Sequence, residues 1–173
     1  MEAIVEWKEK KDIKGFVKFS QERRNEPVHV SVKISGLENG FHGFHIHEKR
    51  IEDFEENVQD CCEKLGGHFN VGESWSLENQ GGTKHGLNGH NGDLCNNIYV
   101  KNNFTEKYFT RRNISLFELD KEYIIGRSIV IHEGVDDCGL IDYSDEEKNI
   151  KKYITGNAGK RIACGNIEKL INL

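Results

Sequence analysis

The segment Gly40–Glu48 constrains this chain more than any other, because it places two histidines on one face of an expected strand. Successive side chains of a strand point to opposite faces, so His45 and His47 share one face while Phe44 and Ile46 share the other. Two imidazoles above an apolar face form half of a rigid metal site, since neutral histidine is the commonest metal ligand in proteins. A His-x-His pair alone fits a polar sheet face better than a metal site, so the metal interpretation needs further ligands.

Further candidate ligands follow downstream in short clusters. They are His68, His85, His90, Asp93 and His132. The two remaining histidines have other predicted roles. His42 shares the parity of Phe44, so we expect it to turn toward the apolar side and to form structural hydrogen bonds there. His29 lies on the polar register of its strand, and we expect it to be exposed.

Short alternating segments recur along the chain, separated by turn residues about every eight to twelve positions, which favours an all-β sandwich or barrel. The predicted strands cover residues 3–7, 14–20, 28–35, 41–48, 97–101, 107–117, 127–133 and 162–171. Between them, residues 49–97 and 134–161 lack sustained alternation and are predicted to be long loops. Because the first loop carries several candidate ligands, metal binding and sulfur cross-links can order it. A length of 173 residues fits one domain spanning residues 1–173.

Charge and hydropathy exclude several classes of partner. The net charge of −5 and the absence of a basic run argue against nucleic-acid binding. No segment is apolar enough for a membrane span, and the N-terminal residues lack a signal-peptide pattern, so we expect a cytoplasmic location. The Asn, Lys and Ile usage suits an AT-rich genome such as that of a large DNA virus, in which case the location is the host cytoplasm.

Six motifs together, in this order, resemble the copper,zinc superoxide dismutase family. They are GFHGFHIHE (residues 40–48), GGHFN (66–70), KHG (84–86), HNGDL (90–94), IIGRSIVIHEGVDD (124–137) and TGNAGKRIACG (155–165). The resemblance extends over essentially the whole chain. It implies an eight-stranded antiparallel Greek-key β-barrel with two long loops over one face.

The resemblance also implies the ligands of two metal ions. Copper would be held by His45, His47, His68 and His132, and zinc by His68, His85, His90 and Asp93. Four imidazoles suit Cu(II), whereas three imidazoles and a carboxylate suit tetrahedral Zn(II). His68 would bind both ions as an imidazolate, because two cations stabilise the deprotonated ring.

Three further groups of residues have roles by the same resemblance. Asp136 would accept hydrogen bonds from His45 and His85 and so fix the orientation of both rings. Arg161 would guide the superoxide anion and hydrogen-bond it beside copper. A funnel formed with Lys160, and with Lys151 or Lys152, would offset the negative net charge.

The implied function is dismutation of superoxide to dioxygen and hydrogen peroxide by alternate reduction and reoxidation of copper, with zinc ordering the site. His68 would release copper and gain a proton in the reduced half of the cycle. The alternative is a non-catalytic dismutase-like protein that binds metal or handles copper; a copper-only dismutase is disfavoured by His85, His90 and Asp93. The implied partners are superoxide, a second copy in a homodimer, and a copper chaperone.

The five cysteines would ordinarily be reduced in a cytosolic protein, since their spacing lacks paired C-x-x-C signatures. The resemblance implies a disulfide between Cys62 and Cys164, with Cys61 as a competitor for the same bond. Cys95 and Cys138 would then be thiols. An insertion at residues 49–60 alters the region where the family has part of its dimer contact, and the ligand spacing from His68 to His90 also departs from the family pattern.

Overall fold

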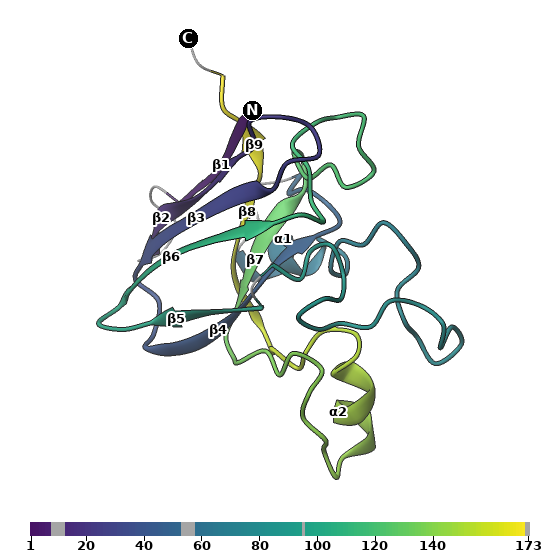
Figure 1. Cartoon of the computed structure of the whole chain (residues 1–173). Helices are drawn as coiled ribbons and strands as arrows, with labels where there is room; N and C mark the ends of the chain where they lie inside the picture. Colours follow the sequence, from purple (N-terminus) through teal and green to yellow (C-terminus); the bar gives the residue numbers. More distant parts are fainter. Residues whose placement is uncertain (8–12, 53–57, 95, 172–173) are drawn as a thin grey trace.

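Two antiparallel sheets form the body of the protein, and both are seen in the computed structural model in Figure 1. The structure describes residues 1–7, 13–52, 58–94 and 96–171. The larger sheet has the order β6-β3-β2-β1-β9, with β6 Phe104–Arg111, β3 Val28–Ser35, β2 Lys14–Ser20, β1 Glu2–Trp7 and β9 Glu168–Lys169. The smaller sheet has the order β5-β4-β7-β8, with β5 Asn96–Val100, β4 Gly40–His47, β7 Ser128–His132 and β8 Arg161–Asn166. The all-β prediction is therefore confirmed.

The described residues contain nine strands rather than the predicted eight, because the last predicted strand is divided. β8 pairs with β7 in the smaller sheet, whereas β9 pairs with β1 in the larger one. The chain crosses between the sheets at Ile167, whose side chain is buried in the core. Its backbone N–H donates to Arg127 O and its carbonyl accepts from Gly126 N. The apolar segment that was predicted to form one strand therefore contributes a strand to each sheet.

The expected strand over residues 107–117 is shifted in the structure, where β6 begins at Phe104 and ends at Arg111. The residues after Arg111 form a turn instead, because the backbone N–H groups of Ser115 and Leu116 donate to acceptors outside any long β-ladder. Ser115 N donates to Glu122 O, and Leu116 N donates to the side chain of Gln21. Apolar and polar residues continue to alternate beyond the end of the strand because the turn also buries apolar side chains.

Two short helices lie in the long loops and were not predicted. They are α1, Val58–Glu63, and α2, Glu146–Lys151 (Figure 1). Six residues are too few for a helical period to be evident in the sequence. Asp145 caps α2 by accepting from Lys148 N at 2.9 Å, a common N-terminal signal. Neither helix could cross a membrane, since none in the described residues is sufficiently long and apolar.

The core lies between the sheets and follows the predicted alternation. In β3 the apolar side chains at residues 28, 30, 32 and 34 are buried, whereas His29 is exposed as expected. Phe44 and Ile46 of β4 and Ile129 and Ile131 of β7 are fully buried on the opposite sheet. Burying each such side chain stabilises the fold by about 1.5–3 kcal/mol, so this core supplies a rigid base for β4 and β7.

Strand β7 is buried on both faces, which explains why all five of its residues are inaccessible. One face packs in the core, and Val130 on the other packs with Cys62 and Leu65 of the first long loop. Between Ile131 and His132 the register with β8 shifts, which indicates a β-bulge or similar irregularity. Such irregularities commonly re-aim a side chain beside a functional site.

Candidate metal centre

Four histidines converge between the smaller sheet and its loops. His45 and His47 project from β4, His132 from the end of β7 and His68 from the first loop. Each offers a nitrogen within 4.8 Å of the others, and all four are buried. One ring nitrogen of each lies buried without a hydrogen-bond partner, namely His45 Nδ1, His47 Nε2, His68 Nε2 and His132 Nε2. Buried polar atoms without partners are rare, so this convergence fits a cation.

The backbone brings His68 to this strand. Phe69 N donates to Ile46 O at 2.9 Å, and Ile46 N donates to Gly92 O at 3.0 Å, so the loop is bonded directly to β4. Gly92 permits this approach, because a Cβ there would overlap the carbonyl oxygen of Ile46. His68 also forms an isolated bridge with His47.

Backbone carbonyls fix which ring nitrogen points inward. His47 Nδ1 donates to Gly66 O and His132 Nδ1 donates to Gly159 O, both at 3.0 Å. Each bond places the proton on Nδ1 and leaves the Nε2 lone pair for a metal. His42 is different, because it bonds through both ring nitrogens, to His132 O and Glu38 O at 2.9 Å. Its predicted structural role is confirmed.

A second cluster adjoins the first and shares His68. It comprises His68, His85, His90 and Asp93, all buried, with ligand atoms within 4.8 Å. Three Nδ1 atoms face the Asp93 carboxylate, at 2.8 Å from His68, 3.0 Å from His85 and 3.3 Å from His90. His90 Nε2 donates to Thr83 O at 3.0 Å, which leaves its Nδ1 on the inner side. Three imidazoles and one carboxylate form the donor set of a tetrahedral zinc site.

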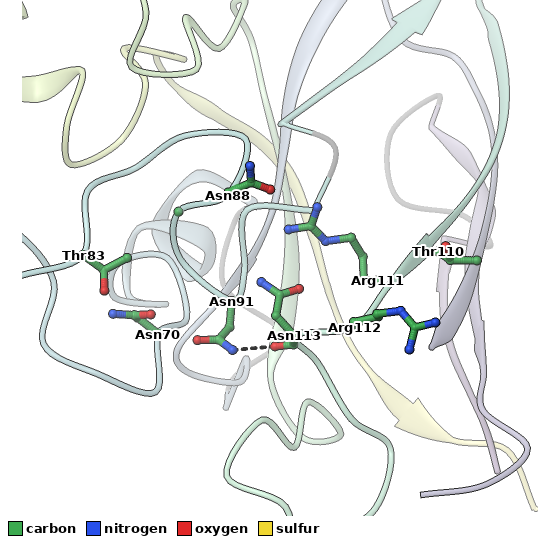
Figure 2. A pocket seen from close by; sticks show the side chains of 9 residues that line it. Asn70, Thr83, Asn88, Asn91, Thr110, Arg111, Arg112 and Asn113 are labelled. Carbon is green, nitrogen blue, oxygen red and sulfur yellow. Dashed lines mark hydrogen bonds between the residues drawn. The ribbon is translucent and has the colours of Figure 1, made fainter. Parts of the chain in front are cut away.

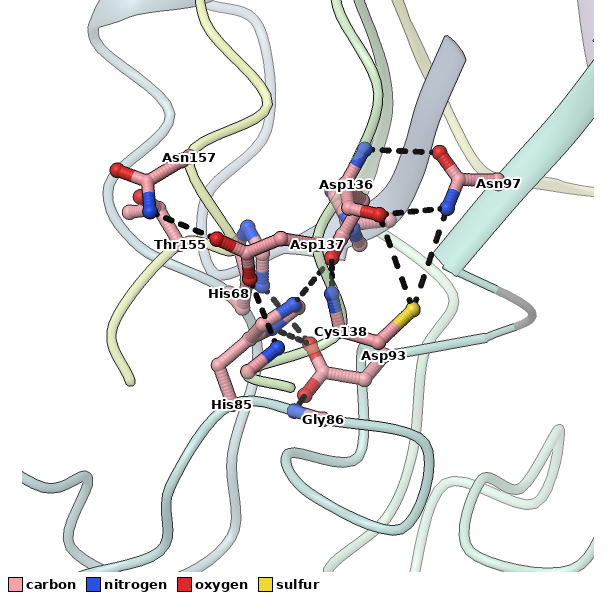
Figure 3. A network of polar contacts seen from close by, with 12 residues as sticks. His68, His85, Gly86, Asp93, Asn97, Asp136, Asp137, Cys138, Thr155 and Asn157 are labelled. Carbon is pink, nitrogen blue, oxygen red and sulfur yellow. Dashed lines mark hydrogen bonds and ion pairs between the residues drawn. The ribbon is translucent and has the colours of Figure 1, made fainter. Parts of the chain in front are cut away.

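Asp136 connects the two clusters. Its Oδ2 accepts from His45 Nε2 at 2.5 Å, and its Oδ1 accepts from His85 Nε2 at 2.8 Å (Figure 3). Asn97 bonds the Asp136 backbone on both sides, accepting from its N–H at 2.8 Å and donating to its carbonyl at 2.9 Å. No local sequence pattern predicts this role of Asn97, because the two bonds join β5 to the second long loop.

The electrostatics favour neutral imidazoles in the first cluster and an ionised Asp93 in the second. Burial lowers the pKa of His45 and His47, and it lowers that of His132 to about 4. Burial raises the pKa of Asp93, but hydrogen bonds from the facing histidines lower it by more. His85 differs, because bonds to Asp136 and Asp93 outweigh burial and raise its pKa to about 9. Neutral histidine and ionised carboxylate are the forms that bind metals.

Comparison with known proteins agrees with this arrangement. The family described as copper/zinc superoxide dismutase (SODC) matches residues 13–167. The chain belongs to this family. An extracellular Cu-Zn superoxide dismutase of Drosophila melanogaster is 39% identical over 155 residues, covering 90% of this chain and 75% of that protein. Superoxide dismutase [Cu-Zn] 4 of Dictyostelium discoideum is 39% identical over 160 residues, covering 91% and 92%. The crystal structure of the clock protein EA4 superposes with a TM-score of 0.74 and 34% identity, covering 98% of this chain and 94% of that one.

The Cu/Zn superoxide dismutases are oxidoreductases that use copper and zinc, and the two clusters of this chain contain the donor types that such ions require. Four imidazoles meet in one cluster, and three imidazoles with a carboxylate meet in the other. The unpartnered nitrogens show that the first cluster fits an ion without rearranging its outer hydrogen bonds.

Arg161 lies at the start of β8 with a side chain that is 16% exposed. Its guanidinium donates to Cys62 O and Gly66 O, each at 2.7 Å. Gly66 O also accepts from His47, so the arginine and one histidine of the first cluster bond to the same carbonyl oxygen. A guanidinium held in this way keeps its charge close to the first cluster.

The lysines near Arg161 differ in availability. Lys152 is buried, and its Nζ lies 2.5 Å from Asp142 Oδ1, so its charge is paired. Lys151 pairs with Glu147 at 2.5 Å. Lys160 is exposed and, among the described residues, forms no ion pair. Lys152 is therefore not available to attract an anion.

The disulfide implied by the family resemblance is present between Cys62 and Cys164. It connects α1 to β8, whose first residue is Arg161. Cys61 is buried beside it, and Cys138 is a partly buried thiol. Cys95 and residues 53–57 of the insertion lie outside the described residues.

A polar cavity of about 550 Å³ is lined by residues of the first long loop and of the end of β6 (Figure 2). Asn91 is one of them, donating from Nδ2 to Asn113 O at 2.5 Å and accepting from Val71 N at 3.0 Å. Arg111 donates from Nη2 to Asp93 O at 2.7 Å. These contacts hold the loop against the end of β6.

Proposed function

We propose that this protein is a catalytically active superoxide dismutase in which the first cluster holds copper and the second holds zinc. The observation that carries the proposal is the convergence of four buried imidazole nitrogens, none of which has a hydrogen-bond partner among the residues that the structure describes. His45, His47, His68 and His132 would be the copper ligands, and His68, His85, His90 and Asp93 the zinc ligands. The whole chain, residues 1–173, would act as one domain.

Bound copper would supply one-electron chemistry by alternating between two oxidation states, so that one superoxide is oxidised to dioxygen and the next is reduced to hydrogen peroxide. The protein must then bind an anion, deliver protons and exclude other reactions. Arg161 supports the first task, because it is permanently charged and already oriented by Cys62 O and Gly66 O. We infer that its guanidinium hydrogen-bonds superoxide.

His68 supports the second task. Its Nδ1 faces Asp93 at 2.8 Å, while its Nε2 points into the first cluster. We infer that Nε2 takes up a proton in one half of the cycle and gives it to the reduced substrate in the other half. The site is almost inaccessible to solvent, with His68 only 4% exposed, so this local proton source has few competitors.

The second cluster would act through structure. Zinc has no redox chemistry, so His85, His90 and Asp93 would serve to hold His68 and the first loop in place. Asp136 would orient one ring of each site through its two carboxylate oxygens.

The overall charge of −5 opposes an anionic substrate, so a local positive field is required. Lys151 and Lys152 each lie 2.5 Å from a carboxylate oxygen, whereas Arg161 Nε lies 3.9 Å from Glu63 Oε2. Arg161 and the adjacent Lys160 are therefore the less closely paired cations. We propose that these two residues attract superoxide to the site.

A homodimer, delivery of copper by a chaperone and a cytoplasmic location stay predictions. The first two follow from the family resemblance. Sedimentation of the purified protein would test the first of these.

The test is superoxide dismutation by purified protein with copper and zinc quantified in the same sample. We expect turnover that tracks copper occupancy, weakens with ionic strength and falls about 10-fold to 150-fold in Arg161→Ala, since hydrogen bonds to charged groups are worth about 1.5–3 kcal/mol. Arg24→Ala is the matched control, because Arg24 pairs with Asp120 and touches neither cluster. Inactive protein with both metals and an intact disulfide would refute the proposal in favour of a non-catalytic metal-binding role.

A further inference from the structure

Three sulfur atoms lie together beneath the first loop. Cys62 and Cys164 form the disulfide, and Cys61 Sγ lies 3.8 Å from Cys164 Sγ. All three cysteines are buried, with their sulfur atoms within 4.8 Å of one another. Ile51 and Leu65 pack in the same cluster. Cys164 therefore has two sulfur neighbours on α1, and a disulfide uses only one.

We propose that Cys164 has two alternative disulfide partners, Cys62 and Cys61, which interchange by thiol–disulfide exchange within the chain. The thiolate of Cys61 attacks Cys164 Sγ, so the Cys61–Cys164 bond forms as the Cys62–Cys164 bond breaks. Cys62 leaves as a thiolate and takes up the proton that Cys61 released. One disulfide is lost and one is gained, so no external oxidant or reductant is needed.

The entropic cost of loop closure is nearly the same for the two disulfides. The loops that they close differ in length by one residue, and the cost of loop closure depends only weakly on length. The choice depends on α1, where adjacent side chains point about 100° apart around the helix axis. Because both sulfur atoms already lie near Cys164, a rotation of α1 by less than that angle is sufficient.

The exchange has a consequence for Arg161, and this part rests on the proposed function. Arg161 Nη1 donates to Cys62 O, and Nη2 donates to Gly66 O. A rotation of α1 moves the Cys62 carbonyl, whereas Gly66 lies beyond the helix. The Cys62–Cys164 disulfide thus fixes the Cys62 anchor of the guanidinium, whereas the Cys61–Cys164 disulfide displaces that anchor and leaves the one at Gly66.

The first experiment maps the disulfides in protein whose Cys95 and Cys138 are replaced by serine, so that three cysteines remain. The folded protein is incubated at pH 8, unfolded in acid to stop exchange, labelled with N-ethylmaleimide and digested without reduction. Fragment-ion mass spectrometry then locates the label. We expect label at both Cys61 and Cys62. Label confined to Cys61 would overturn the exchange.

The second experiment compares two variants that lock the alternatives in the same background. Cys61→Ser permits only the Cys62–Cys164 bond, and Cys62→Ser permits only the Cys61–Cys164 bond. We expect Cys61→Ser to have at least the parent activity per bound copper, and Cys62→Ser to form its disulfide with a several-fold lower activity. A Cys62→Ser protein with both thiols open to label would refute the alternative pairing.

Equal activities of the two disulfide-bonded variants would refute the coupling to Arg161. An inactive, fully metallated parent protein would instead show that the proposed function is wrong. The disulfide map would still decide the exchange in that case, because it does not depend on activity.

Discussion

Replacing Asp136 with asparagine tests the connection between the two clusters. The Asp136 carboxylate is fully buried and accepts from His45 Nε2, His85 Nε2 and Cys138 N. The change keeps the size of the side chain but converts one acceptor oxygen into a donor. We expect Asp136→Asn to weaken metal binding without loss of the fold.

The magnitude follows from the number of donors. An asparagine presents one oxygen and one NH₂ group to two imidazole N–H groups on opposite sides, so at least one buried N–H must face another donor. An unsatisfied buried donor costs about 1–3 kcal/mol. That cost corresponds to an affinity loss of about 5-fold to 150-fold.

Metal affinity is measured by competition with chelators, separately for copper and zinc, with circular dichroism as a test of the fold. Asp137→Asn is the matched control, because it removes the same charge one residue later and its carboxylate bonds Tyr143, Gly139 and Asn157 rather than a histidine. If Asp136→Asn bound both metals as tightly as the parent, the proposed role of the carboxylate in orienting the rings would be refuted.

Three further predictions concern the loops. Reducing the Cys62–Cys164 disulfide, which closes a loop with a sequence separation of 102, should lower the free energy of unfolding by up to about 4.7 kcal/mol, as measured by urea denaturation. Burial, followed by nearby carboxylates, raises the pKa of the Cys138 thiol to about 11, so its alkylation should stay slow at pH 9 and accelerate as the pH rises toward 11. Gly156→Ala should destabilise the metal-free protein by more than about 1–2 kcal/mol, because Gly156 has φ +64° and a Cβ there would overlap the Asp136 carboxylate.

Each of these predictions has a control. The reduction experiment is repeated with Cys62→Ser/Cys61→Ser protein, which should be insensitive to reductant. Alkylation of unfolded protein should show an unperturbed thiol. Gly126→Ala has a similarly positive φ of +87° but no atom within 4 Å of the added Cβ, so it reports backbone strain alone. Equal destabilisation by the two glycine variants would contradict the overlap at residue 156.

Local patterns predicted the strands well where alternation coincides with pairing. β2 and β3 have the predicted bounds, and β4 and β7 differ from prediction by one residue at each end. The strand predictions were wrong beyond Arg111 and at Ile167, where the apolar pattern reflects burial rather than continuous strand pairing. A buried turn and a crossing between sheets require buried side chains just as a strand does.

The sequence by itself determined which donor types the chain offers and which of them share a face, because side-chain parity along a strand depends only on neighbouring residues. It therefore predicted His45 and His47 as a pair and offered further candidate ligands downstream, which the family resemblance assigned to two metal ions. Tertiary structure decided which ring nitrogen of each histidine is left for a metal, since that depends on carbonyls such as Gly66 O and Gly159 O. It also decided which cations are available, because Lys152 meets Asp142 only after the second loop folds. These contacts join groups that no local pattern relates, so only the folded chain brings them together.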